Sequence, residues 1–128
     1  MNSSVSIDSG ELPLVVLTIT GTPVMEDLER ALLAFDELLE NRERYVLVMD
    51  VSAMGVIPSA LRQRAARWLI EHSAEVTACC IGVFCIATTP LARAAIVAME
   101  WLDPRGGKYT FVDTLEVAMK RARRIAAR

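Results

Sequence analysis

The stretch Tyr45 to Val51 reads YVLVMDV, an apolar run in which Asp50 is the one charged residue. Such a run predicts a central β-strand that other elements cover on both faces. The stretch Cys79 to Thr88 reads CCIGVFCIAT and predicts a second buried strand. Since a helical pattern separates the two stretches, we expect an α/β architecture in which these strands are parallel.

The sequence outward from these two strands predicts a hairpin, a last strand and four helices whose apolar residues recur at helical spacing. These elements are a hairpin of Val5 to Ile7 and Leu14 to Thr20, a helix capped by Thr22, a helix from Pro58 or Ser59, a helix from Thr89 to about Leu102, a turn at Gly106 and Gly107, a strand from Tyr109 to Val112, and a terminal helix capped by Asp113 with Glu116. The predicted fold is therefore one α/β domain over residues 1–128, with a mostly parallel sheet after the hairpin and four flanking helices.

Length and charge narrow the class of protein. A chain of 128 residues with 53% hydrophobic residues fits a single globular domain. Residues 1–60 hold ten acidic and three basic side chains, whereas residues 61–128 hold six acidic and eleven basic ones. This difference in charge between the two halves argues against a general nucleic-acid binder and suits docking to a partner of complementary charge.

No segment has the pattern of a membrane span or a secretory signal, so we expect a soluble, cytoplasmic protein.

The cysteine and histidine content argues against metal, cofactor and catalytic roles. The three cysteines, Cys79, Cys80 and Cys85, crowd into seven apolar positions, a spacing that suits buried thiols rather than disulfides or metal ligands. His72 is the single histidine, and the sequence has no glycine-rich phosphate loop and no nucleophile with an adjacent base. We therefore expect no enzyme activity, no cofactor and no metal.

The stretch Tyr45 to Leu69 resembles the anti-sigma-factor antagonist (STAS) fold, because an apolar strand ends in MDVSAM and a short loop leads into a helix. The strand Ile81 to Thr88, followed by TPLAR and by a helix that closes on Trp101 and Leu102, is similar to the SpoIIAA-like branch of that fold. The resemblance implies a switch without catalytic activity, in which a kinase phosphorylates a serine at the start of the helix after the first of these strands. Phosphorylation then changes binding to a partner protein.

The position of that serine departs from the family pattern. The usual acidic-Ser-Ser/Thr-Gly stretch is replaced by Gly55-Val56-Ile57-Pro58, so the matching position is apolar. Ser59 lies close by, and we interpret its hydroxyl as a helix cap in preference to a phosphorylation site.

Polar residues at the ends of the two buried strands form the first candidate site. The loops after these strands should meet at the carboxyl edge of the sheet, where open α/β folds bind ligands. The candidate ligand or partner contacts are Asp50, Ser52, Ser59, Thr88, Thr89 and Arg93. Structural roles remain open for them: Thr89 can cap a helix, Asp50 can bond the strand end, and Arg93 can be a solvated side chain.

The helix after Thr89 is the second candidate, because its apolar residues point in several directions around the helix axis. The candidate residues for self-association are Ile96, Val97, Met99 and Trp101. Internal packing and the wall of a lipid pocket are the alternatives. The leading hypothesis is a regulatory module without catalytic activity that binds an unidentified protein partner and forms a homodimer. The alternative is a small-molecule or lipid-binding domain that uses the strand-end loops and this helix.

Overall fold

The computed structural model describes residues 4–103 and 109–128, which form one five-stranded sheet with the order β1-β2-β3-β4-β5. The strands are β1 (Ser4–Glu11), β2 (Leu14–Gly21), β3 (Tyr45–Met54), β4 (Cys80–Ile86) and β5 (Tyr109–Val112). β1 is antiparallel to β2, and each following pair of neighbours is parallel. The prediction of a hairpin followed by a mostly parallel sheet is confirmed.

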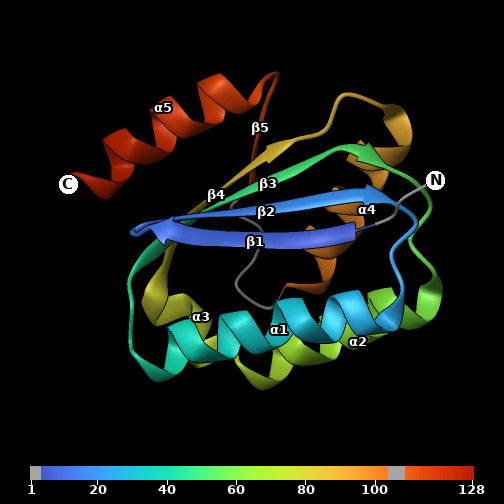
Figure 1. Cartoon of the computed structure of the whole chain (residues 1–128), viewed down its shortest axis with the longest axis horizontal. Helices are drawn as coiled ribbons and strands as arrows, with labels where there is room; N and C mark the ends of the chain where they lie inside the picture. The colour runs from blue at the N-terminus through green and yellow to red at the C-terminus, as the bar shows by residue number, and fades with distance from the viewer. Residues whose placement is uncertain (1–3, 104–108) are drawn as a thin grey trace.

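The described residues form five helices that cover the sheet unequally. The helices are α1 (Met25–Glu40), α2 (Ser59–Glu71), α3 (Ser73–Cys79), α4 (Pro90–Leu102) and α5 (Leu115–Ala126). Figure 1 shows α5 alone on one side of the sheet and α1, α2 and α3 together on the other. Ala92 and Ile96 of α4 belong to the same apolar cluster as α1 and α2, which places α4 on the side of those helices. Each face of the sheet therefore has its own core.

The alternating residues of β3 divide between these two cores. Val46 and Val48 point toward α5 and have no solvent-accessible surface. Tyr45 and Val51 point toward the four other helices and are also buried. This two-sided burial is the reason that the strand shows a continuous apolar run rather than an alternating pattern.

The fifth helix, α3, was not predicted, because seven residues make only two turns and are too short to show helical periodicity. Cys79 lies at its end, so the second buried strand runs from Cys80 to Ile86 instead of from Cys79 to Thr88. β3 is longer than predicted and extends to Met54. The predicted turn at Gly106 and Gly107 lies outside the described residues.

Three of the predicted helix caps were wrong and one is confirmed. β2 continues to Gly21, so α1 begins at Met25 and Val24, not Thr22, occupies its cap position. Pro58, not Ser59, precedes α2, and Thr114, not Asp113, caps α5 by accepting a hydrogen bond from the N–H of Val117. Thr89 caps α4 as predicted, because its Oγ1 accepts a hydrogen bond of 3.1 Å from the N–H of Ala92. Among the described residues, no helix combines the length and the apolar character that crossing a bilayer requires.

Candidate functional site

Asp50 and Ser52 lie in the second half of β3 and bond to each other. Oδ1 of Asp50 accepts hydrogen bonds from the backbone N–H of Ser52 at 3.1 Å and from its Oγ at 2.6 Å. Asp50 pairs with Ile86 of β4, so the carboxyl ends of these two strands lie side by side. The carboxylate of Asp50 thus bonds to its own strand. The sequence had left this structural role open as an alternative to ligand binding.

Ser59 is the first residue of α2, and its side chain is exposed. No side-chain hydrogen bond caps this helix, so our interpretation of Ser59 as a cap is wrong. The reason is that Pro58, immediately before it, has the extended backbone of a cap position (φ −57°, ψ 145°). The hydroxyl of Ser59 instead faces solvent at the positive end of the helix dipole.

Thr88, Thr89 and Arg93 lie where β4 leads into α4. Thr88 is exposed, and Thr89 has the capping role described above. Nε of Arg93 donates a hydrogen bond of 3.1 Å to the carbonyl oxygen of Ala87, and its guanidinium lies 4.9 Å from the centroid of the Phe111 ring. Arg93 therefore ties α4 to the end of β4 and packs over β5, so it has a structural role in addition to any contact with a partner.

The four residues predicted for self-association do not lie on one face of α4. Ile96 is 2% exposed and belongs to the core, which removes it from any association surface. Met99 is half-buried and points to the interior. Val97 and Trp101 are 41% and 86% exposed. The prediction failed for Ile96 because an apolar helix gives no sequence signal for which of its faces turns inward.

Four of the exposed residues of α4 form a stripe, and Leu91 and Arg93 are exposed outside it. Pro90, Ala94, Val97 and Trp101 are all exposed and recur at intervals of four, three and four residues, so they lie along one face of the helix. None of them carries a charge. We call these four residues the α4 stripe.

The charge difference between the two halves of the sequence is partly neutralised within the fold. Nε of Arg64 on α2 lies 2.6 Å from Oε1 of Glu29 on α1. The hydrogen bond from Arg64 lowers the pKa of Glu29 and raises that of Arg64.

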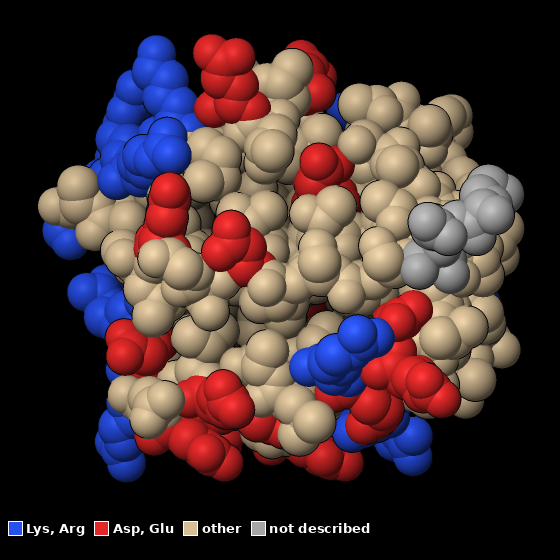
Figure 2. Space-filling model, viewed as in Figure 1, with Lys and Arg blue, Asp and Glu red and all other residues tan. Residues whose placement is uncertain are grey.

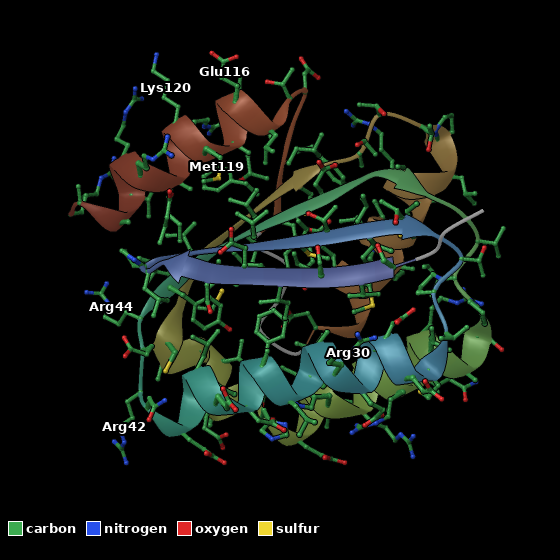
Figure 3. The ribbon with its side chains drawn as sticks, in the orientation of Figure 1. Arg30, Arg42, Arg44, Glu116, Met119 and Lys120 are labelled. Carbon is green, nitrogen blue, oxygen red and sulfur yellow. The ribbon has the colours of Figure 1, made fainter. Side chains whose placement is uncertain are left out.

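Figure 2 shows basic side chains gathered along one end of the molecule, and Figure 3 places Arg42, Arg44 and Lys120 at that end.

A cavity of about 170 Å³ lies between the sheet and helices α1, α2 and α4. It is slightly larger than the engineered apolar cavity of ~150 Å³ that binds benzene in another protein. The walls that the described residues form are apolar except for Arg62 and the two tyrosines Tyr45 and Tyr109. Ile96 and Met99 of α4 contribute to the walls, as expected if this helix borders a lipid pocket. No sequence signal marked Arg62 or the β3 residues as parts of such a site.

The three cysteines lie in the core, and none of them forms a disulfide. Cys85 has no solvent-accessible surface, and burial, together with the negative charge of Glu100, raises the pKa of its thiol to about 12. A thiol with so high a pKa is a poor nucleophile at neutral pH. Within residues 4–103 and 109–128, no group of three histidine, cysteine or acidic side chains is arranged to hold a metal ion.

Comparison with known proteins identifies the fold. No protein-family model and no curated protein sequence matches the chain. An uncharacterized protein of the DUF3478 family from Shewanella loihica PV-4, described as having a SpoIIAA-like fold, superimposes with a TM-score of 0.72 at 15% identity, with 95% of this chain and 96% of that chain covered. The anti-sigma factor antagonist SpoIIAA in its unphosphorylated form gives 0.67 at 13% identity, with 94% and 96% covered. An anti-sigma factor antagonist from Mycobacterium paratuberculosis gives 0.58 at 17% identity, with 95% of each chain covered. The resemblance predicted from the sequence is thus confirmed at the level of fold: this chain has the SpoIIAA-like, STAS-type α/β fold.

Proposed function

We propose that this chain is a cytoplasmic regulatory module without catalytic activity that binds a protein partner, and a second copy of itself, through the α4 stripe. Residues 1–128 act as one domain in this proposal. The fold that the chain shares with anti-sigma factor antagonists supports a regulatory role. The stripe supplies the surface on which a protein can dock.

The observation that carries the proposal is the exposure of Trp101. A tryptophan that is 86% exposed leaves most of a large apolar ring in water. Tryptophan is also the residue type most enriched among the side chains that dominate binding energy at protein interfaces. Val97, one helical turn away, extends the apolar surface along the stripe. Because the opposite face of α4 already fills the core through Ala92 and Ile96, the stripe has no internal partner to pack against within residues 4–103 and 109–128.

Ser59 is a second position at which binding is regulated in this proposal. SpoIIAA, one of the structures with the same fold, is known in unphosphorylated and phosphorylated forms. In the present chain Ser59 is exposed, begins a helix of 13 residues and makes no cap bond. A phosphate there would gain backbone N–H donors and add negative charge to the surface beside α2.

Sedimentation equilibrium over a range of protein concentrations tests the proposal. We expect a concentration-dependent dimer whose dissociation constant rises about tenfold or more in Trp101→Ala and Val97→Asp. Leu33→Asp is the matched control, because Leu33 is 63% exposed on the outer face of α1 and lies outside the stripe. An equal effect of Leu33→Asp, or a wild-type chain that stays monomeric at every concentration, contradicts self-association through α4.

A further inference from the structure

We propose that the cavity between the sheet and helices α1, α2 and α4 binds a small amphipathic carboxylate, such as an unesterified medium-chain fatty acid. The carboxylate lies at Arg62 and the alkyl chain extends along β3. This site goes beyond the proposed function, because it lies on the inner side of α4 and the stripe lies on the outer side.

The space inside the fold remains accessible to solvent. Leu47 and Met49 sit in the middle of the central strand, yet both retain solvent-accessible surface. Their neighbours Val46 and Val48, on the opposite face of the same strand, retain none. The face of β3 beneath a single helix is thus fully packed, whereas the face beneath several helices is not. Protein cores hold few voids larger than a water molecule, so a space of about 170 Å³ is unusual for a purely structural interior.

The walls of the cavity are predominantly apolar. The cavity is lined by every inward-facing residue of β3 from Tyr45 to Val51. Six residues of extended chain span about 20 Å, so the lining follows most of β3, and residues of the four other strands also contribute to it. The opposing walls come from apolar residues of the helices, among them Phe35, Leu69 and Met99. An apolar space whose lining follows about 20 Å of β3 can take a linear alkyl chain of medium length.

Arg62 lies where a charged head group would meet the cavity. Among the described residues that line the cavity, Arg62 is the single charged one and the single exposed one. It therefore marks the point where the interior meets solvent, on the first turns of α2. Among the residues that the structure describes, no acidic side chain forms an ion pair with it. An arginine offers two parallel N–H donors that match a carboxylate, so an anionic head group at the mouth and an apolar tail inside satisfy both parts of the site.

Isothermal titration calorimetry with octanoate and with octanol tests the head group and the tail separately. We expect octanoate to bind with one site per chain and more tightly than octanol, which has the same tail and no charge. Arg62→Gln should weaken octanoate binding about tenfold and leave octanol binding unchanged. Arg67→Gln is the matched control, because Arg67 is exposed on the same helix and does not line the cavity. Equal loss in both variants, or octanol binding as tight as octanoate binding, overturns the role of Arg62.

Filling the space tests the location. Ala95→Leu adds apolar volume to the wall that α4 contributes and should abolish the binding of both probes. If that variant does not fold, nuclear Overhauser effects from the octanoate methylenes to the side chains of Leu47 and Met49 in the wild-type protein locate the ligand directly. Failure of octanoate to bind, or contacts elsewhere on the surface, overturns the proposal. Trp101→Ala should leave octanoate binding unchanged, which separates this site from the self-association proposed above.

Discussion

Nε1 of Trp68 on α2 donates a hydrogen bond of 2.9 Å to Oδ1 of Asp36 on α1. The indole is 5% exposed and forms part of the cavity wall, so this bond satisfies a buried donor and fixes the ring that borders the interior space. The imidazole of His72 stacks on the same ring, with 4.5 Å between the ring centroids. The bond therefore joins the two helices that face β3 and sets the orientation of the largest side chain between them.

Asp36→Ala should destabilise the protein by about 1–3 kcal/mol, because it leaves Nε1 of Trp68 buried without an acceptor. Asp36→Asn retains an oxygen acceptor and should cost less. Urea denaturation followed by circular dichroism measures both changes. Glu37→Ala serves as the control, since Glu37 is exposed on the same helix and should stay within about 0.5 kcal/mol of the wild type. A loss in Asp36→Ala no larger than in the control would show that the bond does not contribute to stability.

The ion pair between Glu29 and Arg64 should make stability depend on pH. The hydrogen bond from Arg64 lowers the pKa of Glu29 below its usual value of 4.5. A lowered pKa in the folded state means that the pair stabilises the protein above pH 4.5 and that this contribution is lost as the pH falls from there through the folded-state pKa. The difference in urea midpoint between wild type and Glu29→Gln should therefore shrink over this range. A constant difference from neutral to strongly acidic pH would exclude the pair as its source.

The thiols should react slowly in the folded protein. Cys79, Cys80 and Cys85 are buried, and the pKa of Cys85 is raised to about 12 by burial and by the charge of Glu100. Titration with a non-penetrating thiol reagent should give slow modification of the native protein and rapid modification of all three cysteines in urea. Rapid reaction of more than one cysteine in the native protein contradicts their burial in α3 and β4.

Ser59→Asp should stabilise the protein by about 0.3–1 kcal/mol, because α2 has no acidic residue in its first turn and a carboxylate there interacts favourably with the helix dipole. Ser59→Ala should change stability by less than about 0.5 kcal/mol, since the hydroxyl makes no cap bond. Chemical denaturation of the two variants beside the wild type measures both effects. Destabilisation by Ser59→Ala of about 1 kcal/mol or more, the usual loss for a cap, would restore the capping role.

The strands that carry the fold could be predicted because their burial is encoded locally. β3 and β4 are covered on both faces, and continuous apolar runs are the direct consequence. Thr89 with Pro90 predicted the start of α4, since capping chemistry involves residues within one turn. Local chemistry failed at Ser59, where the adjacent Pro58 took the cap position, and at α3, which is too short for its periodicity to be read.

Apart from the short helix α3, the sequence by itself determined the order of the elements and the parallel sheet, because both follow from patterns within a few residues of each other. Only the tertiary structure decided that Ile96 fills the core while its neighbour Val97 faces solvent. A helix with apolar residues in several directions around its axis does not specify its rotation, which packing against the sheet fixes. The cavity beside Leu47 and Met49 likewise depends on how closely three helices approach one strand, and no local pattern in the chain encodes that distance.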